Sequence, residues 1–152
     1  MARQPRSALP PVGAFHVINR GVERRPIFLD DEDYLVFGSL LRRATLRFGW
    51  TVYGWVQMPN HFHLVVIAEL DRLSRGMHFL SFRYAEAFNE RYDRSGHLFQ
   101  GRFGARTLEG EEDLGRVCAY VFDNPVRAGL CEPAARYRWT GGDFLELVSD
   151  LR

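Results

Sequence analysis

The sequence predicts a single α+β domain in which strands and helices alternate along the chain. Apolar residues recur at strand spacing in four segments and at helical spacing in three, and turn residues separate these segments. The length of 152 residues suits one domain, and 46% hydrophobic with 26% charged residues is ordinary for a globular chain. An aromatic fraction of 14% argues against disorder.

The first half of the chain is predicted to form a strand, a helix and two further strands. Residues 14–20 alternate apolar and polar side chains, as a half-buried strand does. A helix over 30–49 is expected to begin at four acidic residues, which favour the N-terminal end of the helix dipole, and to end at its glycine. Two segments rich in β-branched and aromatic residues, 50–57 and 61–68, flank a Pro-Asn turn at 58–60 and predict a hairpin.

The second half is predicted to contain two helices and one strand. An apolar stripe at helical spacing indicates a long helix over 71–92. A loop rich in Gly and Arg follows at 94–104, and 103–108 is a candidate fourth strand. The last helix is expected over 111–122 and should end at Asn124-Pro125, because the residue before a proline avoids helical geometry.

The resulting order, βαββαβ with an added helix, is the ferredoxin-like (RRM-like) plan, an antiparallel sheet with helices on one face. The opposite sheet face would then be open to a ligand. We expect residues 1–12 to form a flexible arm and residues 13–152 to form the domain. No apolar run approaches the roughly 18 residues of a membrane span. Cys118 and Cys131 form neither a metal nor a disulfide pattern, which predicts a cytoplasmic chain with reduced thiols.

His61-Phe62-His63 is the sharpest chemical signal in the sequence. Strand side chains alternate between faces, so both imidazoles should project together while Phe62 points into the core. Two imidazoles on one strand can hold a divalent ion and leave positions open for a substrate oxygen. From spacing alone, two surface histidines remain the alternative. His16 on the first strand either faces the same site or is a hydrogen-bonded strand histidine.

Tyr120 and Asn124 lie four residues apart on the last predicted helix and therefore share a face. A phenol is a weak nucleophile at neutral pH, but it becomes useful where a metal polarises the electrophile. The amide oxygen of Asn124 could bind such a metal. The alternative is a half-buried tyrosine followed by an asparagine that ends the helix.

The charge of the chain is segregated, although the total is only +1. All 20 basic residues are arginine, a side chain that binds phosphate in a bidentate manner and stacks on bases. The stretch up to Arg25 has a local charge of +4, whereas residues 108–123 have −4. Between Arg94 and Arg106 there is no acidic residue, and phenylalanines are interleaved with the arginines. This mixture suits nucleic acid, with ordinary solvated loops as the alternative.

Five sequence blocks, in this order, carry a family resemblance: FHVINRG at 15–21, PIF at 26–28, MPNHFHLVV at 58–66, GHLFQGRF at 96–103 and NPVRAGL at 124–130. Together they resemble the REP-associated tyrosine transposases, which belong to the single-tyrosine HUH transposases. The resemblance extends over about residues 13–139.

The resemblance implies metal-dependent cleavage and strand transfer of single-stranded DNA through a 5′-phosphotyrosine intermediate, with recognition of palindromic hairpin DNA. It implies that His61 and His63 hold Mg²⁺ or Mn²⁺, that Tyr120 is the nucleophile, and that Asn124 completes the metal site. The enzyme would be a monomer or a homodimer acting on bacterial DNA. Asp123 departs from the family pattern, which often has an aliphatic residue there.

Five arginines are the expected phosphate contacts: Arg20, Arg24, Arg25, Arg102 and Arg106. Gly104 stands where a basic residue is common in the family. Two other functions remain open at this point. One is a non-catalytic or domesticated protein that only binds hairpin nucleic acid, and the other is a metal-dependent phosphodiesterase that uses water.

Overall fold

The sheet of this protein has five strands in the order β4-β1-β3-β2-β5, and every neighbouring pair is antiparallel. The computed structural model describes residues 4–132 and 137–142. The strands are β1 (Val12–Arg20), β2 (Thr51–Met58), β3 (His61–Glu69), β4 (Gly104–Leu108) and β5 (Thr140–Gly141). The helices are α1 (Asp31–Phe48), α2 (Leu70–Arg91) and α3 (Gly110–Arg127), with short 3-10 turns at Arg6–Ala8 and Val22–Arg24. The predicted order βαββαβ followed by a helix is confirmed.

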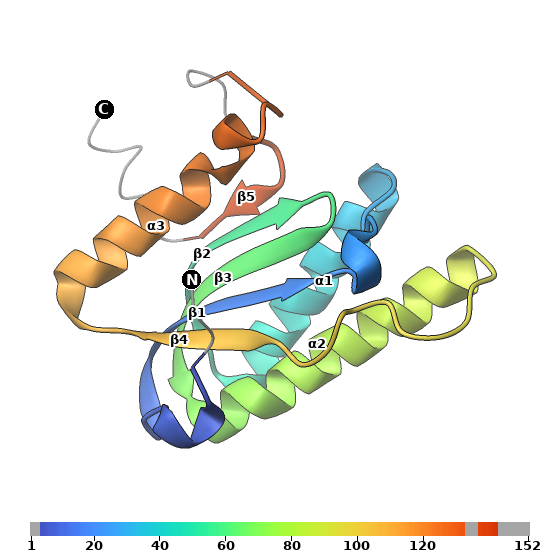
Figure 1. The fold of residues 1–152 in the computed structure, drawn as a ribbon. Helices are drawn as coiled ribbons and strands as arrows, with labels where there is room; N and C mark the ends of the chain where they lie inside the picture. Colours follow the sequence, from blue (N-terminus) through green and yellow to red (C-terminus); the bar gives the residue numbers. More distant parts are fainter. Residues whose placement is uncertain (1–3, 133–136, 143–152) are drawn as a thin grey trace.

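The main core lies between the sheet and the layer of α1 and α2 (Figure 1). Phe62 of β3 and Phe37 of α1 are fully buried, with ring centroids 4.8 Å apart. Tyr84 of α2 meets Phe37 edge to face at 5.3 Å. Burial of each large apolar side chain contributes roughly 1.5–3 kcal/mol, so this aromatic cluster fixes both helices on one face of the sheet.

The sequence analysis expected the second face of the sheet to be open, and this is wrong. α3 packs on that face at β2 (Figure 1). Val56 and Val65 point to this side and are fully buried with Val121 of α3. Gly54 lets the helix approach, since a Cβ there would stand 2.4 Å from the ring of Phe122. The physical reason is that apolar residues on both faces of the central strands require a cover on both faces.

The helix end expected at Asn124-Pro125 is wrong, because α3 continues through the proline to Arg127. Pro125 lacks an N–H, so the helix loses one hydrogen bond at this position. The proline ring is buried, and this apolar contact offsets the loss. Two residues after this end, Gly129 takes a left-handed φ of 73° and stops the helix from continuing. The N–H of Leu130 donates to the carbonyl of Pro125 at 2.8 Å, which forms the closing bond of a Schellman motif.

The fifth strand was not predicted. β5 pairs with Trp55 and Val56 at the edge of β2, and the Thr140 hydroxyl donates to the carbonyl of Trp55 at 2.9 Å. A strand of two residues has no periodicity that a sequence reading can detect.

Residues 4–11, which belong to the expected flexible arm, lie against the domain. The side chain of Gln4 accepts a hydrogen bond from the N–H of Thr107 at 3.0 Å, and Leu9 is buried in the main core. The carbonyl of Pro11 accepts from the N–H of Leu70 at 2.8 Å. This described part of the segment therefore packs at the ends of β4 and α2.

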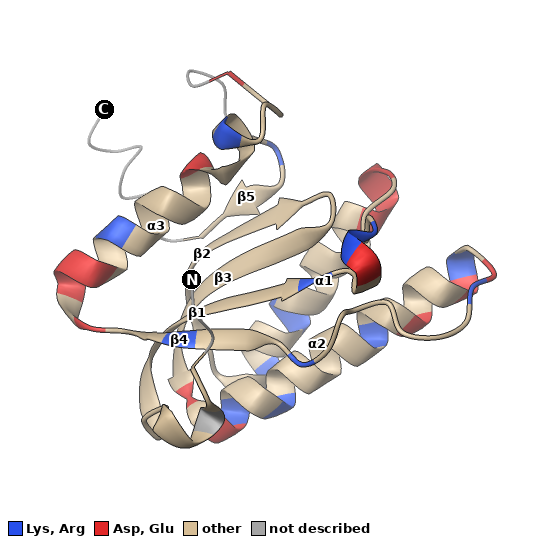
Figure 2. Ribbon diagram, in the orientation of Figure 1, with Lys and Arg blue, Asp and Glu red and all other residues tan. Residues whose placement is uncertain are grey.

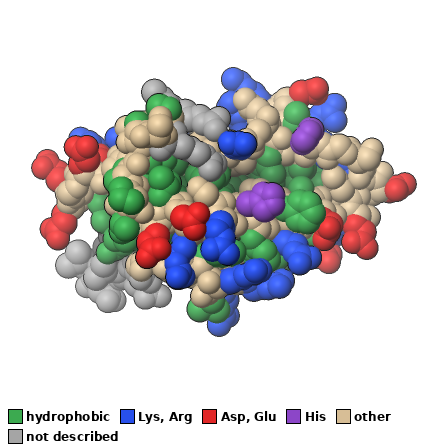
Figure 3. Space-filling model, turned by 90° about the horizontal axis from the view of Figure 1, so that it is seen from below, with side chains coloured by type: hydrophobic (Ala, Val, Ile, Leu, Met, Phe, Trp, Pro, Cys, Tyr) green, Lys and Arg blue, Asp and Glu red, His purple; other side chains and the backbone are tan. Residues whose placement is uncertain are grey.

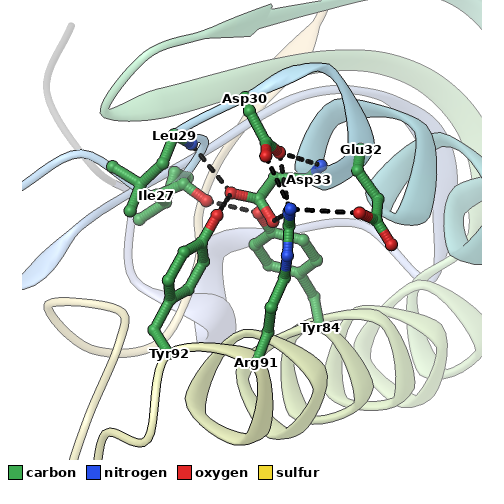
Figure 4. A network of polar contacts seen from close by, with 8 residues as sticks. All are labelled: Ile27, Leu29, Asp30, Glu32, Asp33, Tyr84, Arg91 and Tyr92. Atoms are coloured by element: carbon green, nitrogen blue, oxygen red, sulfur yellow. Dashed lines mark hydrogen bonds and ion pairs between the residues drawn. The ribbon is translucent and has the colours of Figure 1, made fainter.

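An ionic network joins the N-terminus of α1 to the C-terminal end of α2 (Figure 4). Asp30 caps α1 by accepting from the N–H of Asp33 at 3.1 Å. Arg91 contacts Asp30 at 2.6 Å, Glu32 at 3.0 Å and Asp33 at 2.7 Å. The hydroxyl of Tyr92 donates to Asp33 at 2.6 Å. Asp33 is only 3% exposed, so it is a buried carboxylate that depends on these donors.

Asp33→Ala should lower the free energy of unfolding by about 2 kcal/mol, because it leaves the Tyr92 hydroxyl without its acceptor and removes the buried one of the three carboxylates that contact Arg91. The matched control is Asp31→Ala in the same helical turn. Asp31 makes an exposed ion pair with Arg138 at 2.7 Å, so its removal should cost less than about 1 kcal/mol. Urea unfolding monitored by circular dichroism measures both. Equal losses would show that the network does not stabilise the fold.

None of the helices in the described part of the chain is long and apolar enough to cross a membrane.

Candidate active site

The two histidines of β3 lie side by side on the face that α3 partly covers. Phe62 between them is fully buried in the opposite core, so the predicted alternation is confirmed. The imidazole centroids of His61 and His63 are 5.0 Å apart, with the rings at 82°. His61 is half-buried, whereas His63 is only 5% exposed.

His16 of β1 joins this pair. Its Nε2 lies 2.8 Å from Nδ1 of His63, and the two rings stack with centroids 5.0 Å apart. His16 therefore faces the same site and also makes a hydrogen bond. Both alternatives that the sequence analysis gave for His16 are correct.

All three imidazoles are neutral at neutral pH. Burial is the largest cause, and it lowers the pKa of His63 to about 2 and those of His16 and His61 to about 4. Neutral imidazole is the form that binds a metal ion. A cation could therefore bind these imidazoles without first displacing a proton from an imidazolium.

The Nδ1 atom of His61 is 2.7 Å from the side-chain oxygen of Asn60. The amide nitrogen of Asn60 donates to the carbonyl of Arg24 at 3.2 Å, which fixes which end of the amide faces the imidazole. Because an amide oxygen can only accept, Nδ1 of His61 carries the proton and Nε2 keeps its lone pair. This is the arrangement in which outer hydrogen bonds orient a metal-binding histidine.

The Pro-Asn turn between β2 and β3 also holds the segment that follows β1. The N–H of Gly21 donates to the carbonyl of Asn60 at 2.9 Å, and that of Ile27 donates to Pro59 at 2.8 Å. These bonds bring Arg24 and the neighbouring Arg25 to the His61 end of the hairpin. Their side chains are exposed.

Two of the five predicted phosphate contacts lie directly beside the histidines. Arg20 is opposite His61 in the register of β1 with β3, and its charge adds to the lowering of the pKa of His61. Arg106 is opposite His16 in the register of β1 with β4, and it does the same there. Arg102 is exposed on the loop before β4. Acidic residues lie at the N-terminal end of α3 (Figure 2), and one of them, Asp113, forms an ion pair with Arg106 at 3.5 Å.

Tyr120 is 48% exposed on α3, and the guanidinium of Arg127 lies 4.0 Å from its ring centroid. Arg127 also donates to Asp123 at 3.1 Å. The positive charge of Arg127 contributes to the lowered pKa of His63. The same guanidinium therefore contacts Tyr120 and acts electrostatically on His63. Among the described residues, no hydrogen bond or ring contact joins Tyr120 to His61 or His63. The sequence analysis assigned no role to Arg127, although this residue lies in the NPVRAGL block and seven residues after Tyr120.

Asn124 is half-buried, and its amide nitrogen is buried with no hydrogen-bond partner among the described residues. Such a group costs about 1–3 kcal/mol unless a ligand satisfies it. No set of three or more His, Cys, Asp or Glu side chains in the described part of the chain is placed to hold a metal. Asn124 therefore has an amide group that is free to bind a ligand, on the helix that packs over the same sheet face as the two imidazoles.

The family model for "Transposase IS200 like" matches residues 13–124 of this chain, a stretch that includes the histidines, Tyr120 and Asn124. The chain belongs to the IS200-like transposase family. No curated protein sequence matches this transposase.

Two solved structures share the fold of this transposase. A REP associated tyrosine transposase bound to a REP hairpin is 17% identical with a TM-score of 0.76, over 98% of this chain and 86% of that chain. A putative transposase from Deinococcus radiodurans is 18% identical with a TM-score of 0.53, over 80% of this chain and 95% of that chain. At these identities the likeness establishes the fold, and the predicted fold class is confirmed.

Proposed function

We propose that this transposase cleaves and rejoins single-stranded DNA at hairpin-forming palindromes through a covalent bond to Tyr120, as REP-associated members of the family would. The observation that carries the proposal is the pair of neutral histidines on one strand, each with Nδ1 already engaged in a hydrogen bond. This pair faces the side of the sheet on which α3 presents Tyr120.

The residues on this face fit a divalent cation. His61 and His63 would hold it through Nε2, and Asn124 would supply an amide oxygen. Bound there, Mn²⁺ or Mg²⁺ would polarise the scissile phosphate and neutralise developing negative charge. Imidazole ligands suit Mn²⁺ better than Mg²⁺, which prefers oxygen, so we expect Mn²⁺ to bind more tightly.

The hydroxyl of Tyr120 attacks the phosphorus and loses its proton to water, to which its half-exposed side chain gives access. The P–O bond to the 3′ oxygen breaks, and that oxygen leaves as a free 3′-hydroxyl after taking a proton from water. The downstream fragment stays on the enzyme as a 5′-phosphotyrosine. Attack by a second 3′-hydroxyl reverses these steps and joins strands, so the phosphodiester energy is kept and no nucleotide triphosphate is needed.

DNA would reach the site along an arginine-lined edge. Arg20, Arg24 and Arg25 stand at the His61 end of the sheet, and Arg106 stands beside His16. Each can contact phosphate oxygens, and Arg127 places a further cation against the ring of Tyr120. Recognition of a folded hairpin by its shape is consistent with the REP hairpin bound to the structural neighbour.

His16 is a positioning residue in this proposal. His63 can offer Nε2 to a cation only if its Nδ1 carries the proton and Nε2 of His16 accepts it. His16→Leu removes the acceptor and should weaken Mn²⁺ binding about 10- to 100-fold, whereas His16→Gln keeps an acceptor and should lose less. Electron paramagnetic resonance of free Mn²⁺, titrated without DNA, measures this. Equal Mn²⁺ affinity in both variants and the wild type would refute the role.

The test of the function uses one hairpin oligonucleotide labelled at either its 5′ or its 3′ end. After incubation with Mn²⁺ and denaturation, the 3′ label should migrate with the protein and the 5′ label should be released with a free 3′-hydroxyl. Chelation with EDTA should prevent both. Tight hairpin binding with no adduct would identify a non-catalytic binder, and cleavage without adduct would identify a hydrolase. Either result overturns the proposal.

A further inference from the structure

A groove of about 1140 Å³ lies between α2 and the loop that precedes β4, on the helix side of the sheet (Figure 3). Met77, Leu98 and Phe99 give its inner wall an apolar character. Phe82 stands at the rim with 56% of its surface exposed, and the imidazole of His78 stacks on it with centroids 6.0 Å apart. An exposed aromatic pair beside an apolar groove is unusual unless a ligand covers it.

A cluster of arginines on α1 and α2 adjoins this groove. Arg43, Arg47 and Arg83 lie over the ring of Phe79, with guanidinium carbons 5.6, 5.4 and 6.0 Å from the centroid. Stacking orders each guanidinium and leaves its N–H edge available to bind phosphate. A shallower hollow of about 550 Å³ at this cluster shares Phe82 with the groove, so the two surfaces are continuous.

The cluster is positively charged overall. Residues 34–68 contain no acidic residue. The carboxylates nearby on α2 form exposed ion pairs with neighbouring arginines, as Glu86 does with Arg83 at 3.7 Å. Neither Arg43 nor Arg47 has a carboxylate partner in the part of the chain that the structure describes. Figure 3 shows blue side chains gathered below the centre of the view, with red side chains to either side of them.

The opposite wall of the groove is attached to the strand beside the candidate active site. The N–H of Gln100 donates to the carbonyl of Arg20 at 2.9 Å, and the side chain of Arg20 donates to that of Gln100 at 3.3 Å. Arg20 is the register partner of His61. Arg102, also on this wall, adds an exposed cation. A nucleic-acid strand leaving the histidines at this end of the sheet would meet the groove next.

We propose that the groove and the arginine cluster bind an unpaired segment of the DNA substrate, with bases inside the groove and phosphates on the arginines. This inference rests on the proposed function and names where the single strand runs. A positively charged surface with exposed aromatic rings is the arrangement that holds single strands by stacking. Duplex DNA would use the arginines alone, because its paired bases cannot enter the groove.

The experiment measures DNA affinity by fluorescence anisotropy in EDTA, with Tyr120→Phe in every variant so that no chemistry occurs. The probes are a blunt hairpin and the same hairpin with a single-stranded extension at its 5′ or 3′ end. Phe82→Ala should weaken binding of one extended hairpin about 10-fold and leave the blunt hairpin unchanged. Arg43→Gln with Arg47→Gln should lower the salt slope for that probe by about 0.7 per arginine.

Leu35→Ala is the matched control, since Leu35 is 58% exposed on α1 and lies outside the groove and the cluster. An equal loss on blunt and extended hairpins, or no loss on either extended hairpin, overturns the inference. Adduct formation by the wild type with binding insensitive to Phe82→Ala would refute this inference alone. A selective loss on an extended hairpin in a protein that forms no adduct would support it while the proposed function fails.

Discussion

Tyr120→Phe should reduce formation of the covalent DNA adduct by at least about 1000-fold, because phenylalanine has no oxygen to attack the phosphorus. The change should leave the protein otherwise intact. The ring of Tyr120 is half-exposed, and its hydroxyl makes no hydrogen bond within the described residues, so the free energy of unfolding should change by less than about 0.5 kcal/mol. Arg127 can stack on phenylalanine as it does on tyrosine.

Tyr53→Phe is the control for this substitution. Tyr53 is half-buried on β2 and packs with the cluster that seats α3, so it is a second tyrosine on the same face of the sheet. Its variant should form the adduct at the wild-type rate. Quantification on a denaturing gel compares the two, with hairpin affinity measured in parallel. An adduct that persists in Tyr120→Phe and disappears in Tyr53→Phe would assign the nucleophile to Tyr53.

Features set by local spacing were predictable from the sequence. The alternation of a strand placed His61 and His63 on one face and Phe62 in the core. The acidic residues before α1 predicted its N-terminus, and Asp30 does cap it. These signals depend only on residues within a few positions of one another, so no tertiary information was needed.

Features that depend on register between distant segments were not predictable. The contact of His16 with His63 joins residues 47 apart, and it exists because β1 runs beside β3 in one particular register. The arginine cluster around Phe79 likewise needs α1 packed against α2. The end of α3 was misplaced because a buried proline is tolerated within the helix and the glycine cap lies four residues further on.

The hairpin turn shows how a short block can serve structure and chemistry together. Asn60 orients His61 through its side-chain oxygen and holds the segment after β1 through its amide nitrogen. The same residue therefore links the proposed metal site to the loop that carries Arg24 and Arg25. The sequence block alone does not distinguish the role of Asn60 in orienting His61 from its role in holding the loop. The two hydrogen bonds assign one role to each end of the amide.

His61→Ala should weaken Mn²⁺ binding and lower adduct formation by at least about 100-fold, because one of two imidazole ligands is lost. His61 gives a sharper test than His63. Its side chain is half-buried, whereas His63 is 5% exposed and hydrogen-bonded to His16, so His63→Ala would also leave a cavity and an unpaired imidazole. His97→Ala, on an exposed loop, is the control for histidine loss in the Mn²⁺ titration alone, because His97 lines the proposed DNA groove. Isothermal titration with Mn²⁺ in the absence of DNA separates binding from chemistry. Unchanged Mn²⁺ affinity in His61→Ala, with the adduct still formed after chelation, would show that this histidine pair is not a metal site.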